Sequence, residues 1–418
     1  MERTRVPLSQ LISSYQTASE PVVSVEIRLL ALPVQETLTA SHGSHARREL
    51  TVVRLGAGNN TTPDHGWGEC AALPTAAYWP ETAVSSFELL SSIAGELLGR
   101  PSLEILDLNG ETETSSGKGL TTTSAISGFP MARAALEMAV LDLVLTAADT
   151  SLAELLDAGI EPVPAGATIG LADPEAAADR VETLHKQGFT RIKLKIEPGH
   201  DVSVVEAVLR RVGGAVAHDK LFLQVDANGS YDSSSHAQEV LLRVAALGIE
   251  VVEQPYPIDQ IDPAMALCAA LAAAGLPTVV LTDEGAVTVE DALHLVQAKA
   301  ADGLVIKPSR LGGIAAALRL LDRASSKSFA VSIGGMQESG LGRHALAVVA
   351  AVAHQSPSVL IGDLSPARRW LADDPWPDIE MVDDGGPARV LVPRCSGVAP
   401  APDPELLDRY TVKQHSVP

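Results

Sequence analysis

The chain has 418 residues, of which 46% are hydrophobic and 3% aromatic, so it is long enough for two domains with a large core of Ala, Val and Leu. Its formal net charge of −21 argues against nucleic acid and against an anionic membrane surface as partners. Cys70, Cys268 and Cys395 are widely separated and lack the spacing of a metal site, which is typical of inert thiols in a reducing compartment.

The first 21 residues lack the continuous apolar segment of a signal peptide, and they predict a weakly ordered N-terminal extension. The longest apolar region, residues 264–281, is interrupted by Gly275 and Pro277, which indicates a helix followed by a strand and not a membrane span. We therefore expect a cytoplasmic protein without a membrane partner.

Residues 22–160 predict an α+β domain. Three β-like segments, VSVEIRLLAL, RRELTVVRL and GWGECAAL, are typical of an antiparallel sheet, and the apolar segment 130–145 predicts a helix. Two segments are expected to be irregular. Residues 33–48 form a long polar loop of the kind that serves as a lid, and residues 109–127 form a flexible insertion rich in Ser, Thr and Gly.

From residue 163 the pattern alternates between strands and helices. The predicted strands are residues 164–169, 191–196, 221–225, 251–254, 279–283, 303–307, 329–332 and 358–362. Eight strands with intervening helices predict an α/β fold with a TIM-like (β/α)₈-type barrel, which we assign to residues 161–368. A doubly wound parallel sheet is the competing fold, but no GxGxxG motif follows any of these strands. Residues 369–418, rich in Pro, Asp and Gly, are expected to return to the first domain.

Ionisable residues recur where the predicted strands end. In residues 191–196 polar and apolar residues alternate, so Lys193 and Lys195 share one face of the strand. The later strands end, at intervals of one strand and one helix, in Asp226 with Asn228, Glu253, Asp283 with Glu284, and Lys307. Because the carboxyl ends of barrel strands share one face, we expect these side chains to converge on one pocket.

The order lysine, acid, acid, acid, lysine predicts metal-assisted chemistry. Three neighbouring carboxylates need a cation between them, and oxygen ligands favour a hard dication, Mg²⁺ first. This arrangement suits removal of a proton next to a carboxylate, because the metal neutralises the enediolate while a lysine on each side takes or returns a proton. Lys193 beside Lys195, together with the metal, is expected to lower the pKa of the amine that serves as base.

Six motifs strengthen this interpretation: IKLKI, VDAN, VEQP, TDE, IKPSR and GGMQESGLGR. In this order and spacing they resemble the enolase superfamily, and the likeness runs from about residue 22 to the C-terminus. The chain is most similar to the muconate-lactonizing subgroup, and within it to o-succinylbenzoate synthases and N-succinylamino acid racemases. The resemblance implies an α+β capping domain with a lid over a (β/α)₇β barrel. Gly334 and Gly335 stand where the mandelate-racemase pattern has a histidine base.

The resemblance also implies a role for each strand-end residue. Asp226, Glu253 and Asp283 would bind Mg²⁺, with Mn²⁺ as a substitute. Strand alternation lets only one of Asp283 and Glu284 point inward, and the resemblance selects Asp283. Lys195 would be the acid/base on one face of the substrate, Lys193 its helper, and Lys307 the group on the other face. The remaining residues near metal or substrate would be Asn228, Glu284, Arg310, Gly334, Gly335 and Met336.

The expected activity is dehydration of 2-succinyl-6-hydroxy-2,4-cyclohexadiene-1-carboxylate to o-succinylbenzoate, a step of menaquinone synthesis. The alternative is racemisation of N-succinylamino acids by the same residues, or another racemisation or epimerisation of the muconate-cycloisomerase type. A non-catalytic carboxylate-binding barrel is the hypothesis of a different class. The expected partners are a small carboxylate and, by the resemblance, further copies of the chain in a homo-oligomer.

Three features depart from the family pattern and put the substrate in question. The lid begins Pro33-Val34 where the family has Pro-Phe, residues 282–285 read TDEG where it has DES, and residues 109–127 are additional. Gly312-Gly313 fits either a tight turn or a contact with substrate.

Overall fold

A parallel sheet of eight strands, in the order β12-β11-β10-β9-β8-β7-β6-β5, forms the larger part of the protein. The computed structural model describes residues 6–35, 39–40, 43, 46–58, 64–107, 126–218 and 220–418. The eight strands are β5 (Gly166–Ile169), β6 (Arg191–Lys195), β7 (Phe222–Asp226), β8 (Val251–Glu253), β9 (Val279–Thr282), β10 (Gly303–Ile306), β11 (Ala330–Ile333) and β12 (Val359–Leu360). Their carboxyl ends therefore share one edge, as the strand-end interpretation requires.

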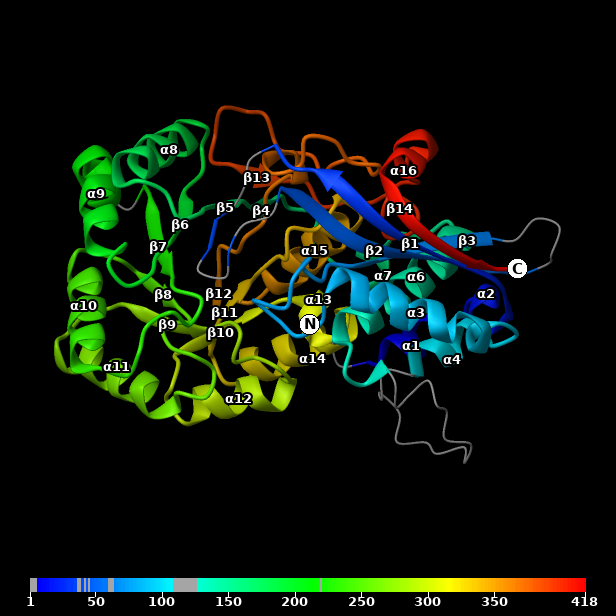
Figure 1. Cartoon of the computed structure of the whole chain (residues 1–418), viewed down its shortest axis with the longest axis horizontal. Coiled ribbons are helices and arrows are strands. Elements are labelled where there is room, and N and C mark those ends of the chain that lie inside the picture. The colour runs from blue at the N-terminus through cyan, green and yellow to red at the C-terminus, as the bar shows by residue number, and fades with distance from the viewer. Residues whose placement is uncertain are drawn as a thin grey trace.

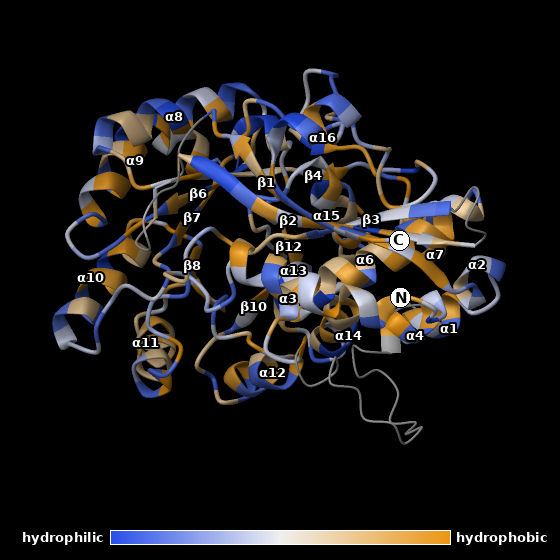
Figure 2. Cartoon of the chain, turned by 45° about the vertical axis from the view of Figure 1, so that its right-hand side comes forward, coloured by the Kyte–Doolittle hydropathy of each residue, from blue (hydrophilic) through white to orange (hydrophobic). Residues whose placement is uncertain are grey.

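Helices connect successive strands and surround the sheet (Figure 1). They are α8 (Pro174–Lys186), α9 (Val202–Val216), α10 (Ser235–Ala246), α11 (Ile261–Ala273), α12 (Val289–Gln297), α13 (Pro308–Leu311), α14 (Ile314–Ser325) and α15 (Gly340–Ala353). Side chains cap several of them, since Asp173, Ser234 and Thr288 each accept a hydrogen bond from a backbone N–H of the first turn. Figure 2 shows α8 in mostly hydrophilic colours and α9 as a mixture, which is the amphipathic pattern of helices on the outside of a barrel.

The first and last strands of the sheet meet and close the barrel. The Gly166 N–H donates to the carbonyl of Leu364 over 3.2 Å, and Thr168 Oγ1 donates to Asp363 Oδ1 over 2.8 Å. No barrel helix follows β12 before the chain leaves through the short 3₁₀ turn η2 (Ala367–Arg369), so the architecture is of the (β/α)₇β type. The predicted α/β barrel is confirmed.

A second, antiparallel sheet in the order β14-β1-β2-β3 forms the core of the capping domain. Its strands are β1 (Val22–Pro33), β2 (Arg47–Ala57), β3 (Asp64–Cys70) and β14 (Thr411–Val417). The helices around it are α3 (Ala83–Leu97), α4 (Ser102–Asp107), α6 (Pro130–Ala147) and α7 (Leu152–Leu155). Most residues of α6 are buried, and Gly66 and Gly68 of β3 let its backbone approach directly. The motif GWGEC therefore serves packing between β3 and α6.

The C-terminal residues complete both units. β13 (Arg389–Val390) pairs with β4 (Val163–Pro164) beside the barrel, and α16 (Pro404–Tyr410) leads into β14. β14 pairs with β1 in antiparallel register, with Val417 opposite Val25. The last strand of the chain thus lies in the antiparallel sheet of the capping domain, next to β1.

The expectation of a weakly ordered segment before residue 22 was wrong for its described part. Residues 8–19 contain α1 (Leu8–Ile12) and α2 (Gln16–Ser19), and Leu8, Ile12 and Ala18 are buried. These helices are too short to give a hydrophobic period, and they are ordered by packing against the capping domain.

Residues 36–38, 41–42 and 44–45 of the predicted lid (33–48) and residues 109–125 of the predicted insertion (109–127) lie outside the described residues. The described lid residues contact the rim of the barrel. Gln35 N–H donates to the carbonyl of Trp370, and Leu171 N–H donates to the carbonyl of Thr39, both over 2.7 Å. None of the helices in the described parts of the chain is long and apolar enough to cross a membrane.

Candidate active site

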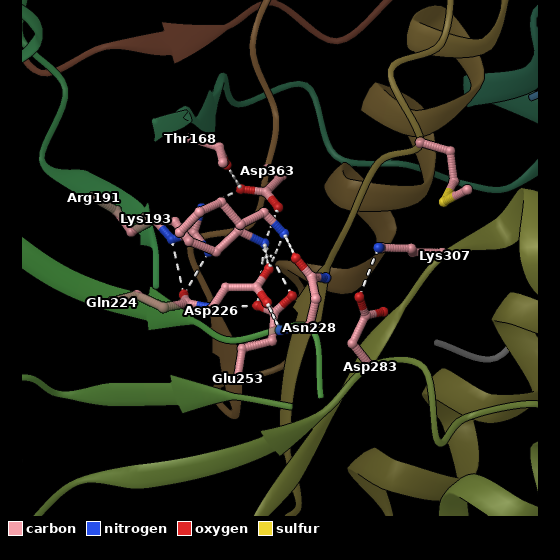
Figure 3. Close-up of polar contacts among 12 residues, drawn as sticks. Thr168, Arg191, Lys193, Gln224, Asp226, Asn228, Glu253, Asp283, Lys307 and Asp363 are labelled. Atoms are coloured by element: carbon pink, nitrogen blue, oxygen red, sulfur yellow. Dashed lines mark hydrogen bonds and ion pairs between the residues drawn. The ribbon is translucent and has the colours of Figure 1, made fainter. Parts of the chain in front are cut away.

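The inward face of β6 carries the cationic side chains Arg191, Lys193 and Lys195, two residues apart from one another as strand alternation predicts. Lys193 Nζ lies 2.5 Å from Asp363, 3.0 Å from Glu253 and 3.2 Å from Asp226. It is 2% exposed, so these carboxylates replace the water that would otherwise solvate the ammonium. Figure 3 shows Lys193 among them at the centre of the group.

Lys195 contacts the end of the neighbouring strand β7. Its Nζ donates to Asp226 Oδ2 over 2.7 Å and to Asn228 Oδ1 over 2.5 Å. Asn228 has a φ of 45°, and its side-chain N–H donates to Glu284 Oε1 over 2.7 Å. A chain of hydrogen bonds therefore runs from Lys195 through Asn228 to Glu284, joining the ends of β6, β7 and β9.

Lys307 stands across the site from Lys193 with its own acid (Figure 3). It follows β10, and its Nζ donates to Asp283 Oδ2 over 2.7 Å and to the Tyr78 hydroxyl over 2.9 Å. Arg310, which is fully buried, lies 2.8 Å from Asp283 Oδ1 and donates to the same hydroxyl over 2.5 Å. The predicted residues Lys307, Asp283 and Arg310 thus form one cluster with Tyr78 of the capping domain.

Glu284 corrects the expectation that only one of the two consecutive acids after β9 reaches the site. β9 ends at Thr282, so Asp283 and Glu284 both belong to the loop, where strand alternation no longer applies. Asp283 is fully buried and Glu284 is 8% exposed, and each contacts a different site residue.

Asp363 is a site residue that sequence reasoning missed. It follows β12, ion-pairs with Lys193 and Arg191, and accepts a hydrogen bond from Thr168. The sequence contained a signal for it, because Asp363 comes directly after the predicted strand 358–362. Glu253 and Asp283 similarly lie at or next to the ends of their predicted strands. Arg191 was missed because an arginine at the start of a strand resembles a surface residue.

The formal charges of the site balance. The cations are Arg191, Lys193, Lys195, Lys307 and Arg310, and the carboxylates are Asp226, Glu253, Asp283, Glu284 and Asp363. Burial would lower the pKa of Lys193, but Asp363, Glu253 and Asp226 raise it above the usual lysine value. Asp283 likewise raises the pKa of Lys307 against the effect of burial. Both groups are held as ammonium ions in this arrangement.

The pKa values of the neighbouring acids Asp226 and Glu253 shift in opposite directions. Burial raises the pKa of Asp226, but Lys195 and Lys193 outweigh it and hold the pKa well below the usual range. For Glu253, burial and the neighbouring charge of Asp226 raise the pKa. Two adjacent strand ends therefore present carboxyl groups of different acidity.

A cavity of about 420 Å³ opens over these residues. Six cationic and two acidic side chains line it: Lys193, Lys195, Lys307, Arg180, Arg343, Arg369, Asp179 and Asp363. Both acids are already paired, Asp363 with Lys193 and Asp179 with Arg211 over 2.5 Å. In a protein of net charge −21 this lining thus has more cationic than acidic side chains, which favours an anionic ligand.

The glycines after β11 have distinct places. Gly335 lines the cavity, whereas a Cβ on Gly334 would lie 2.6 Å from Val305 and 3.1 Å from Lys307. Met336, expected near the substrate, is buried, and its carbonyl accepts a hydrogen bond from Arg48 of the capping domain over 3.0 Å. Gly334 therefore leaves room for the stem of Lys307.

For Gly312-Gly313 the structure gives a third explanation beside a turn or a substrate contact. Both residues have positive φ, 95° and 136°, and side chains there would meet Arg133 and Glu137 of α6. Arg133 donates to the carbonyl of Leu311 over 3.2 Å, and Glu137 accepts from the N–H groups of Ile314 and Ala315 at the start of α14. The two glycines make room for the capping domain.

Comparison with known proteins agrees with this architecture. Residues 176–405, more than half of the chain, match the family described as enolase C-terminal domain-like. The chain belongs to the enolase superfamily. It is 32% identical over 388 residues to an N-succinylamino acid racemase of Amycolatopsis, covering 93% of this chain and 96% of the relative. It is 30% identical to the o-succinylbenzoate synthase of Bacillus subtilis, covering 83% and 86%.

Solved structures of the superfamily share the fold. A dipeptide epimerase from Cytophaga hutchinsonii, solved with Mg and a dipeptide, matches with a TM-score of 0.81 over 95% of this chain and 100% of that chain. At 22% sequence identity, this likeness shows the fold alone. The resemblance to the enolase superfamily noted from the six motifs is confirmed, and its synthase and racemase branches are both represented among the relatives.

The donor set of this superfamily member is chemically suited to a hard dication. Asp226 and Glu253 are paired in the β7–β8 register, and Asp283 follows β9, so three neighbouring strands present only oxygen donors. Glu284 Oε2 is buried and accepts no hydrogen bond from the described residues. Asp226, Glu253 and Asp283 form ion pairs with the lysines and with Arg310. Among the described residues no three His, Cys, Asp or Glu side chains lie close enough together to hold a metal ion.

Proposed function

We propose that this protein removes a proton α to a carboxylate and that its main reaction is the dehydration of 2-succinyl-6-hydroxy-2,4-cyclohexadiene-1-carboxylate to o-succinylbenzoate. The observation that carries the proposal is the pair of buried amines, Lys195 and Lys307, which contact carboxylates at the ends of different strands under one cavity. A binding protein for carboxylates would not need two amines held in this way.

The charge of the cavity favours a substrate with two carboxylates. The cations and acids of the site are equal in number, so a dication and a substrate dianion together would preserve neutrality. A substrate with a free ammonium group, such as a dipeptide, would meet no unpaired acid in the lining, since Asp179 and Asp363 are both neutralised. Succinylated substrates therefore fit better than dipeptides.

In the proposed reaction Lys195, as the free amine, takes the α-proton of the ring carboxylate and returns a proton to the hydroxyl group that leaves as water. Lys307 remains an ammonium and stabilises the negative charge that develops on the carboxylate oxygens. Lys193 fixes Asp226 and Glu253, and Asn228 orients the amine of Lys195 through the 2.5 Å hydrogen bond. The overall change is loss of one water molecule and formation of the aromatic ring.

We propose that Asp226, Glu253 and Asp283 hold Mg²⁺ in the working protein. When bound, the ion supplies positive charge next to the substrate carboxylate and so makes the α-proton more acidic. The support is the oxygen-only donor set of three neighbouring strands, together with the Mg found in the dipeptide epimerase that shares the fold.

Racemisation of N-succinylamino acids is the second candidate. It is favoured by the 32% identical relative from Amycolatopsis and by the amines of Lys195 and Lys307 at the ends of different strands, since racemisation needs a proton donor opposite the base. Both substrates carry two carboxylates, so the charge of the cavity suits both reactions.

The test is turnover of the cyclohexadiene by the purified protein with Mg²⁺ and with EDTA, followed by ultraviolet absorbance, beside exchange of the α-hydrogen of N-succinylamino acids in D₂O. We expect fast, EDTA-sensitive dehydration that falls at least about 1,000-fold in Lys195→Ala, as loss of a general base does. Exchange without dehydration would favour the racemase. Neither activity from a folded, Mg²⁺-loaded protein would reject the proposed function.

A further inference from the structure

Arg48 of the capping domain contacts the wall of the cavity without lining it. It lies at the start of β2, is 2% exposed, and is the last residue of the predicted lid. Its Nε donates to the carbonyl of Gln337 over 2.9 Å, and its Nη2 donates to the carbonyl of Met336 over 3.0 Å. Both acceptors belong to the segment after β11 that contributes Gly335 and Gln337 to the cavity lining.

The rest of the guanidinium is anchored in the capping domain. Its Nη1 donates to the carbonyls of Ala72 (2.7 Å) and Glu49, and its Nη2 also donates to the carbonyl of Ala71 over 2.6 Å. The planar guanidinium of Arg48 therefore donates hydrogen bonds to backbone carbonyls of both domains. A lysine has one nitrogen and cannot bridge these directions.

The segment that Arg48 holds has a costly conformation. Gln337 has a φ of 56°, in the left-handed region that residues with a side chain seldom adopt. Such backbone conformations persist where the surroundings fix them, and they occur at functional sites. Here Arg48 fixes the carbonyls of Met336 and Gln337, while Glu338 accepts from the Met336 N–H over 2.7 Å.

We infer that Arg48 is a positioning residue, which fixes the backbone of residues 335–337 and thereby the shape of the cavity wall against which the substrate binds. The inference rests on the proposed function only in taking this cavity as the place of the substrate. Arg48 does not touch the lysines or the acids that carry the chemistry, so its effect is on substrate binding and not on proton transfer.

The test compares Arg48→Lys, which keeps the charge, and Arg48→Met with a matched control on the same strand. Thr51→Val is the control, because the buried Thr51 hydroxyl also donates to a backbone carbonyl, that of Ala83 over 2.8 Å, but within the capping domain. Hydrogen–deuterium exchange of residues 334–340, the melting temperature, KM, kcat and the pH profile are measured for each variant with Mg²⁺ present.

We expect faster exchange of residues 334–340 in Arg48→Lys and a KM raised about tenfold, or about 1.4 kcal/mol of binding free energy, with kcat and its pH profile nearly unchanged. Thr51→Val should lower the melting temperature without either change. Exchange in Arg48→Lys equal to that of the natural protein, or kinetics equal to those of Thr51→Val, would overturn the inference. If the natural protein turns over neither substrate, the proposed function fails, but the exchange comparison still decides the role of Arg48.

Discussion

At the scale of single residues, the site depends on groups that leave space as much as on groups that react. Gly334 is the clearest case, because the stem of Lys307 and the side chain of Val305 occupy the place where its Cβ would lie. The sequence pattern placed Gly334 near the substrate, whereas its contacts assign it to the lysine. A glycine in a site motif can thus define the path of a neighbouring side chain.

Gly334→Ala should displace Lys307 and lower kcat at least about tenfold, with a loss of stability of about 1–3 kcal/mol from overpacking. Enzyme kinetics and urea denaturation of the purified variant measure the two effects. Gly213→Ala is the control. Gly213 lies in the last turn of α9, and a Cβ at this position would meet no atom within 4 Å. Normal kcat in Gly334→Ala would contradict the assigned role.

At the scale of elements, the capping domain holds the barrel helices that follow the functional strands. Glu137 of α6 accepts hydrogen bonds from the first N–H groups of α14, and Glu69 of β3 does the same for Ser339 and Gly342 at the start of α15. A carboxyl group at a helix N-terminus satisfies unpaired N–H groups, and where it is ionised it also offsets the helix dipole. Since α13 and α14 follow Lys307, this contact joins the capping domain to the catalytic strand.

Glu137→Gln removes the charge but keeps the shape of the side chain. We expect it to lower the free energy of unfolding by about 1–2 kcal/mol, because the charged acceptor at a buried helix terminus is lost. Urea denaturation measures this. Asp291→Asn provides the comparison, because Asp291 also accepts hydrogen bonds at a helix N-terminus but is exposed, so its replacement should cost less than about 1 kcal/mol. Equal losses in the two variants would count against the bridging role.

How much could be predicted from sequence also differs by element. Strong periodicity and the rule that acids and lysines follow strand ends were sufficient for the barrel and for the cluster around Lys193, Asp226 and Glu253. They failed where a contact depends on distant segments: the buried N-terminal helices, the closure of the barrel at Asp363, and the contact of Arg133 and Glu137 with Gly312-Gly313. In these cases the local sequence has no period, and tertiary packing decides the structure.

At the scale of the whole molecule, buried acids between the two domains make stability depend on pH. Burial raises the pKa of Glu69 to about 8, with Glu338 acting in the same direction and Ser339 and Arg48 opposing it. The unfolded chain releases this proton near its usual pKa of 4.5. Between these values the folded state binds more protons than the unfolded state, so this group makes stability fall as the pH rises through the window.

Glu69→Gln should therefore flatten the decline in the free energy of unfolding between pH 5 and 8. Each pH unit of difference between the folded and unfolded pKa values is equivalent to about 1.4 kcal/mol. Denaturation series across this range measure the slope, with Glu175→Gln on the exposed surface of α8 as the control. An unchanged slope in Glu69→Gln would show that this carboxyl group does not govern the dependence. The lowered pKa values of Asp226 and Asp363 act only at more acid pH.

The pairing of Val25 with Val417 has a consequence for synthesis of the protein. The antiparallel sheet of the capping domain cannot pair with β14 until the entire barrel has been translated. The backbone groups on one edge of β1 therefore remain unpaired for most of that time. Contacts of such long sequence separation also slow folding in vitro. A bulky fusion placed directly after β14 should consequently impair production of soluble protein more than one placed before α1.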